Sequence, residues 1–460
     1  MKQTKKRPIS ETKLLKRKIQ KLSKKVEELQ EENKTLKQLL QEFREKFFGK
    51  KKKKEDKEPE KLKKKKKRGA PFGHKGITRK TPDHIDEYVE VKLDKCPHCQ
   101  STHLTPLEET YDHTQEDIVV EPRIKVTCYQ HQLYYCKGCK KSVYADAGEG
   151  ELPGSYIGPV AKSIANYLHY QFKLPYRKIK TFFKELFKFD FSHTSAVGFD
   201  NQTYRKGKTT YNKMEKKLPN QPFVHVDETG WKKDGINYWL WCFGSPEYIL
   251  FHIDKRRSGK VVTERLGNSY NGVLISDFLS AYNKIQCRKQ RCLVHLLRLV
   301  KKWIVFFEQD KKRKRFFETL KILLKEILKY SAKKIIDPSP EEIDRQADWI
   351  ARLRRLLRTS QDHKKADDFL KRLINKFEEL ITCLKIPEIE AHNNTAERIL
   401  RDSVIMRKIT FCNRSEQGAL NHSVLMSLIQ TARLHQLNPL GFLHLLLTNT
   451  TAAAKAINIE

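Results

Sequence analysis

Three acidic residues, Asp227, Asp277 and Glu397, have the side chains and the sequence settings that best suit metal-dependent chemistry. Asp227 ends the alternating stretch 223–227, which predicts a strand, and Asp277 follows a second predicted strand at 272–276. Carboxylate oxygens are the ligands that Mg²⁺ prefers, and two ions about 3.5 to 4 Å apart can hold both the attacking and the leaving oxygen of an in-line phosphoryl transfer. An aspartate after a strand is also a common turn former, so the third acid is needed for the metal interpretation.

The elements that would position the two aspartates follow one another along the chain. We predict a turn at residues 228–230 and then strands at 237–243 and 248–253, which are rich in aromatic and β-branched residues and are separated by Gly-Ser-Pro. A predicted helix at 257–266 leads to the strand before Asp277. The order β, β, β, α, β allows the first and fourth strands to be neighbours in a mixed sheet, with both aspartates at their carboxyl ends.

The third acid, Glu397, lies in the first turn of a predicted helix for which Asn394 or Thr395 is the expected cap. Residues 278–396 are too many for a loop in a compact domain. Apolar residues at helical spacing within them predict a helical insertion at about 300–385. We expect Cys292 and His295 to pack rather than to bind metal, and His225 to lie in the sheet.

The charge of the chain indicates a polyanionic partner. Its 460 residues include 93 Lys and Arg against 56 Asp and Glu, which gives a formal net charge of +37. We find no apolar run of membrane-spanning length and no secretory signal, so we expect no membrane association and a reducing cytoplasm in which the cysteines are thiols or metal ligands. The basic runs at 311–315 and 352–358 either follow a DNA backbone or form solvated helix faces, and the sequence leaves both open.

The N-terminal residues 1–49 have a heptad repeat that predicts a coiled-coil dimer. One seam position is filled by Leu15, Leu22, Leu29 and Leu36, and Asn33 falls in the second, where a polar residue typically sets register and a two-stranded state. A single solvated amphipathic helix is the alternative. Residues 50–68 are mostly lysine, and we predict a disordered basic linker over residues 50–82 that either binds phosphates or is only a spacer.

Two C-x2-C pairs, Cys96 with Cys99 and Cys136 with Cys139, predict a zinc ribbon over residues 83–150 that holds one structural Zn²⁺. Residues 151–218 read as helical with a break at Leu174-Pro175, and this pattern fits either a helix-turn-helix-like DNA reader or plain helix packing. A catalytic domain at 219–437 and a C-terminal tail at 438–460 complete an α/β multidomain chain.

Several motifs in this order resemble the IS66 family of insertion-sequence transposases. They are RGAPFGHKG, LPYRK, HVDETGW, SDFLSAY with the following CLVH, and NNTAERILR. The usual family pattern before the cysteine pairs is closer to GxQPGHxG, so the role of residues 69–76 is open. The resemblance implies a ribonuclease H-like catalytic core and places the family's acidic triad on Asp227, Asp277 and Glu397.

The resemblance implies a bacterial, nucleoid-associated enzyme that binds both transposon ends and target DNA. Two Mg²⁺ or Mn²⁺ ions on the triad would support cleavage at the 3′ ends and strand transfer. Arg398 and Arg401 would hold a DNA phosphate, unless Arg401 only pairs with Glu397 along the helix. Small accessory transposition proteins are further expected partners. The competing hypotheses are a zinc-dependent dimeric DNA-binding regulator and a ribonuclease H-like nuclease of recombination or repair.

Overall fold

The computed structural model describes residues 23–27, 29–31, 84–85, 97–98, 100–102, 124–143 and 150–459. The chain divides into two compact units, Met1–Val119 and Val120–Glu460, and each is considered by itself. Over the described ranges, no helix has both the length and the apolar character needed to cross a bilayer.

In the first unit, residues 23–27 and 29–31 are helical. Leu29, one of the predicted seam residues, is about half exposed in the single chain. Leu15, Leu22, Asn33 and Leu36 lie outside the described residues. The coiled-coil dimer therefore stays a prediction.

The second unit begins with a two-stranded antiparallel hairpin of β1 (Tyr134–Cys136) and β2 (Lys141–Val143). Cys136 ends β1 and Cys139 lies in the turn, where a hydrogen bond from the Cys139 main chain is the chief cause that lowers the pKa of the Cys136 thiol. A lowered thiol pKa suits a metal ligand. The partner pair, Cys96 and Cys99, lies outside the described residues, so the zinc site also stays a prediction.

Three helices precede the main sheet: α2 (Pro159–Tyr170), α3 (Tyr176–Phe187) and α4 (His193–Lys217). The predicted break at Leu174-Pro175 is confirmed, because α3 begins directly after Pro175, whose φ of −64° suits a helix N-terminus. Apolar faces of the three helices share a small core that includes Ile179, Phe183 and Phe199.

The main sheet has five strands in the order β5-β4-β3-β6-β7. β3 is antiparallel to β4 and parallel to β6, and β6 is parallel to β7, so the predicted adjacency of the first and fourth strands is confirmed. The bounds are β3 (Phe223–Lys233), β4 (Ile236–Gly244), β5 (Ile249–Asp254), α5 (Gly259–Leu266), β6 (Ser269–Ser276) and β7 (Gln286–Arg291).

The predicted turn at residues 228–230 is wrong. β3 continues through this stretch, because Thr229 and Trp231 pair with β4 and the Trp231 side chain is buried. The chain reverses instead at Asp234 and Gly235, which have φ angles of 50° and 74°. Two consecutive positive φ angles are typical of a tight hairpin turn, and aspartate followed by glycine adopts them readily.

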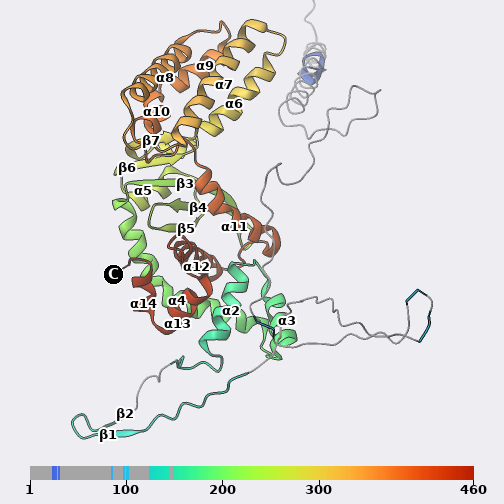
Figure 1. Ribbon diagram of the computed structural model, residues 1–460, viewed down its shortest axis with the longest axis vertical. Coiled ribbons are helices and arrows are strands. Elements are labelled where there is room, and N and C mark those ends of the chain that lie inside the picture. Colours follow the sequence, from blue (N-terminus) through green and yellow to red (C-terminus); the bar gives the residue numbers. More distant parts are fainter. Residues whose placement is uncertain are drawn as a thin grey trace, which may run out of the picture. The chain divides into compact units, whose positions relative to one another are not determined.

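Helices α6 to α10 form the predicted insertion and lie together next to β6 and β7 (Figure 1). Their bounds are α6 (Leu293–Phe306), α7 (Lys311–Ser331), α8 (Pro340–Arg358), α9 (Lys364–Ile374) and α10 (Phe377–Lys385). One apolar core joins these helices to Val273 and Ile275 of β6. The insertion therefore packs on the strand that leads to Asp277.

After the insertion come α11 (Asn394–Thr410), α12 (Glu416–Leu434), α13 (Pro439–Thr448) and α14 (Thr450–Ala456). The segment predicted as a C-terminal tail, 438–460, instead supplies Phe442, Leu446 and Ile457 to the same core as the sheet. Its apolar residues are buried there because α13 and α14 pack near α4.

Helix side chains bind the main chain at both edges of the sheet. On β5, the amide nitrogens of Ile249 and Phe251 donate to the hydroxyls of Thr431 and Ser427 at 3.0 and 2.8 Å. On β7, the hydroxyl of Thr382 in α10 donates to the carbonyl of Lys289 at 2.7 Å. These contacts satisfy polar groups that an edge strand would otherwise leave unpaired.

Candidate active site

Asp227 and Asp277 lie at the same level on neighbouring parallel strands. The last paired residues of β3 and β6 are His225 and Ile275, and each aspartate stands two residues beyond its strand's member of that pair. β6 ends at Ser276, while β3 continues and pairs with β4. The two aspartates therefore flank the point where the strands separate. Asp277 follows the end of its strand as predicted, whereas the prediction that Asp227 ends its strand is wrong, because β3 runs on to Lys233.

The main chain at Asp277 is held by the buried side chain of Arg291. Arg291, which is fully buried at the end of β7, donates to the Asp277 carbonyl at 2.8 Å and to Asn283 Oδ1 at 2.7 Å. Its Nε donates to Glu379 of α10 at 2.5 Å. The Asp277 carboxylate itself accepts from the Leu279 amide at 2.8 Å, which closes a turn after the strand.

Asn393, immediately before α11, attaches the helix that carries Glu397 to β3. Its Nδ2 donates to the Val226 carbonyl at 2.8 Å, and its Oδ1 lies 3.1 Å from His225 Nδ1. Its main-chain amide donates to Cys292 Sγ at 3.2 Å. Asn393 is 1% exposed, so these contacts are shielded from water. They place Glu397, one helical turn later, near the aspartates.

The sequence-based assignment of a cap at Asn394 or Thr395 is wrong. α11 begins at Asn394, so Asn393 occupies the cap position, yet its side chain makes no capping hydrogen bond. That side chain is used for the contacts to β3 instead. The prediction that Glu397 lies in the first turn is confirmed.

Two basic side chains of α6 lie beside Glu397. His295 Nε2 is 3.7 Å from Glu397 Oε1, and Arg298 Nη2 is 3.9 Å from Glu397 Oε2. Glu397 Oε1 and His295 Nδ1 are buried atoms with no hydrogen-bond partner among the described residues. His295 therefore faces the acid, whereas Cys292 is fully buried and packs as expected.

The electrostatics show that the three acids share one environment. Burial, with smaller contributions from Glu228, Asp277 and Glu397, raises the pKa of Asp227 to about 7. Like charges that oppose ionisation in this way must lie close to one another. Asp277 and Glu397 therefore lie close enough to Asp227 to affect its ionisation.

Glu228, the neighbour of Asp227, is held by hydrogen bonds within the fold. Its carboxylate accepts from Arg257 at 2.9 and 2.8 Å and from the Tyr282 hydroxyl at 2.5 Å. Successive strand residues point to opposite faces, so Glu228 points away from the face that bears Asp227. The sequence analysis did not identify Glu228, Arg291 or Asn393 as residues that support the site. Only the run of polar residues at 392–394 could have indicated a special role for Asn393.

The donor set fits hard divalent cations. Three carboxylates supply the oxygen ligands that Mg²⁺ and Mn²⁺ take, and both the unpartnered Glu397 Oε1 and the raised pKa of Asp227 mark charge that a cation would neutralise. Within the described ranges, however, no three His, Cys, Asp or Glu side chains already converge as metal ligands. A bound ion would have to draw these acids together.

The arginines predicted to contact DNA are both exposed on α11. Arg398 Nη2 donates to Thr395 Oγ1 at 3.2 Å. The cations within 4 Å of Glu397 in the described part of the chain are His295 and Arg298, so Arg401 does not pair with the acid. Both arginines are thus available to a ligand near the triad.

The comparison with protein families identifies the class. Residues 154–421, more than half of the chain, match the family model described as "Transposase IS66 family". A transposase is a DNA-processing enzyme, so DNA is the partner that the family implies. The chain belongs to the IS66 family of transposases. A comparison with curated proteins found no match.

Proposed function

We propose that this protein cleaves DNA at the 3′ ends of an insertion sequence and joins those ends to target DNA. Asp227, Asp277 and Glu397 would hold two Mg²⁺ or Mn²⁺ ions. The observation that carries the proposal is the placement of the acids: two at the same level on adjacent parallel strands, and a third on a helix attached to β3 through Asn393. Asp277 and Glu397 both contribute to the raised pKa of Asp227.

The topology supports a ribonuclease H-like core. Three antiparallel strands continue into two parallel ones, and the first strand lies in the middle of the sheet. A helical insertion between the second and third acids is compatible with this core, because α6 to α10 pack on β6 and β7 and leave α11 free to return to β3.

The proposed reaction has two displacements at phosphorus. Water first attacks the phosphodiester at the transposon end, and the bond to the 3′ oxygen breaks to leave a 3′ hydroxyl. That hydroxyl then attacks a target phosphodiester, whose own 3′ oxygen leaves. Bound divalent ions would activate the attacking oxygen and stabilise the leaving one.

The protein's own residues would organise this reaction. Asp227 would hold the ions together with Asp277 and Glu397, which both contribute to its raised pKa. Arg291 and Asn393 hold the Asp277 main chain and the start of α11. Arg398 and Arg401 would bind phosphates of the DNA end, since both are exposed beside Glu397.

The test is incubation of the full-length protein with DNA that carries the flanking repeats, with and without Mg²⁺, followed by mapping of nicks and joined products. We expect Mg²⁺-dependent nicks at the 3′ ends and strand-transfer products. Asp277→Asn should abolish both while DNA binding is kept. Binding without cleavage would favour a DNA-binding regulator, and nicks without joined products would favour a nuclease.

A further inference from the structure

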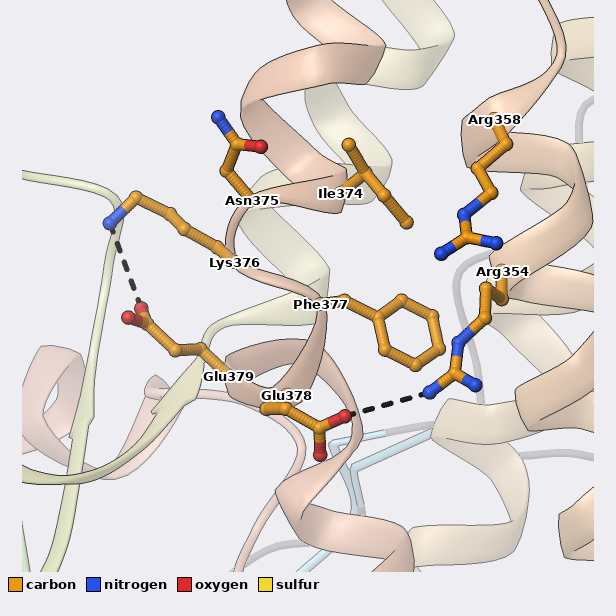
Figure 2. Close-up of a pocket in the computed structure, with 8 residues that line it drawn as sticks. All are labelled: Arg354, Arg358, Ile374, Asn375, Lys376, Phe377, Glu378 and Glu379. Atoms are coloured by element: carbon orange, nitrogen blue, oxygen red, sulfur yellow. Dashed lines mark ion pairs between the residues drawn. The ribbon is translucent and has the colours of Figure 1, made fainter.

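A cavity of about 370 Å³ lies in the helical insertion, between the C-terminal part of α8 and the corner where α9 passes into α10 (Figure 2). Arg354 and Arg358 of α8 form one wall, and Phe377 of α10 lies opposite them. The first turn of α10 adds Glu378 and Glu379, and Lys376 precedes it. The cavity is outside the acidic triad.

The two arginines are one helical turn apart, and both guanidinium groups point toward the cavity (Figure 2). Like charges at this spacing repel one another unless an anion lies between them. Arg354 lies with its guanidinium carbon 4.6 Å from the centre of the Phe377 ring, and its Nη2 is 3.6 Å from Glu378 Oε1. The ring contact fixes the plane of this guanidinium group.

The acids in the cavity wall are already paired with other cations. Glu378 also accepts from Lys385 at 2.6 Å, and Glu379 pairs with Arg291 at 2.5 Å and with Lys376 at 3.7 Å. Among the ion pairs of the described residues, none includes Arg358, which is exposed. In the arginine wall of the cavity, Arg358 therefore carries a positive charge without a matching acid among the described residues, while Arg354 shares Glu378 with Lys385.

We propose that this cavity binds a phosphate of the DNA backbone through Arg354 and Arg358. A guanidinium group presents paired donors that match phosphate oxygens, and two such groups on one helix face form a site for a single phosphate. The proposal rests on the proposed function only for the source of the phosphate.

The position of the cavity in the fold supports DNA over a free anion. Lys376 donates to Asn283 Oδ1 at 2.7 Å, and Arg291 donates to the same oxygen at 2.7 Å and to the Asp277 carbonyl at 2.8 Å. The turn that borders the cavity is therefore part of the hydrogen-bonded network that holds the second acid. DNA bound at both the cavity and the acidic triad would span one continuous packed region.

The test compares two exposed arginines of α8 that lie less than one turn apart. Arg358 borders the cavity, and Arg355 does not. Binding of labelled random-sequence duplex DNA to the full-length protein is measured across a salt series without Mg²⁺. Loss of one phosphate contact should reduce the slope of log affinity against log salt by about 0.9, so we expect this change for Arg358→Ala and none for Arg355→Ala.

Equal effects of the two substitutions would mean a general solvated basic face and would overturn the proposal, as would no effect of either. A second arm adds inorganic phosphate at constant ionic strength. If phosphate raises the melting temperature of the wild type but not of Arg358→Ala, while the DNA slopes are equal, the ligand is free phosphate and the DNA proposal fails. Mg²⁺-dependent cleavage is scored separately, so loss of this proposal leaves the proposed function testable.

Discussion

His295 Nε2 lies 3.7 Å from Glu397 Oε1, which brings the first turn of α6 against the first turn of α11. The two residues are remote in the sequence, and the chain between them forms the helical insertion. An imidazole at this distance can orient the carboxylate without being a metal ligand itself. His295 Nε2 also lies 3.2 Å from Arg298 Nη1, and we propose that this pair positions the third acid.

Replacement of His295 should weaken the response to Mg²⁺. For His295→Ala we expect an increase of about 10–100-fold in the Mg²⁺ concentration that gives half-maximal cleavage, because groups that orient metal ligands typically contribute that much. A Mg²⁺ titration of the nicking rate measures it. The exposed Lys301→Ala on the same helix is the control. An unchanged Mg²⁺ midpoint in His295→Ala would contradict the positioning role.

Asn393→Ala should separate α11 from β3. The substitution leaves the buried Val226 carbonyl without its donor, which costs about 1–3 kcal/mol of stability, and it should slow cleavage because Glu397 loses its placement. Thermal unfolding and the nicking assay report the two effects. The adjacent Asn394→Ala is the matched control, since its side chain makes no hydrogen bond among those described. Equal losses for both variants would argue against the specific role of Asn393.

The raised pKa of Asp227 makes the stability of the protein depend on pH. The folded chain keeps a proton on this carboxyl up to a pKa of about 7, whereas the unfolded chain releases it near 3.8. The folded state is therefore favoured below that window and loses stability as the pH rises through it. Asp227→Asn should remove this dependence and raise the melting temperature at neutral pH, by about 2–4 °C for each kcal/mol recovered.

Thermal unfolding from pH 4 to 8 would check this, with Glu416→Gln as an exposed acidic control. Mg²⁺ should raise the melting temperature of the wild type more than that of Asp227→Asn. A parallel pH dependence in the two proteins would show that Asp227 is not the titrating group.

Arg291→Met should destabilise the network under Asp277. The change removes a fully buried cation and leaves the Asp277 carbonyl and Glu379 without their donor. Loss of one member of a buried pair costs about 3–5 kcal/mol, and Lys376 near Glu379 favours the lower end. Urea unfolding measures it. The double variant Arg291→Met/Glu379→Leu should recover part of the loss, and additive losses would contradict the pairing.

The aspartates could be predicted from the sequence because their surroundings follow a local pattern. Apolar and polar residues alternate before Asp227, and an apolar run precedes Asp277, so the strands and their order were evident. The turn after Asp227 was predicted wrongly because Gly230 suggested a reversal, although glycine can also lie within a strand.

Other features depend on contacts between remote segments. β7 has the sequence QCRKQR, which looks exposed, yet Gln290 and Arg291 are buried because α10 supplies their partners. Asn393 joins α11 to β3 across most of the catalytic region, and no local spacing reveals such a contact. The sequence of α8 alone does not distinguish the arginine wall from any other basic helix face, because the contact of Arg354 with Phe377 joins two separate helices.

The way α12 and α10 cover β5 and β7 limits how copies of this chain can associate. Strand addition needs open amides and carbonyls at the rim of a sheet, and here Ser427, Thr431 and Thr382 already bind several of them. Among the described residues, contacts between copies would therefore have to form away from these two edges, with each sheet remaining internal to its own subunit.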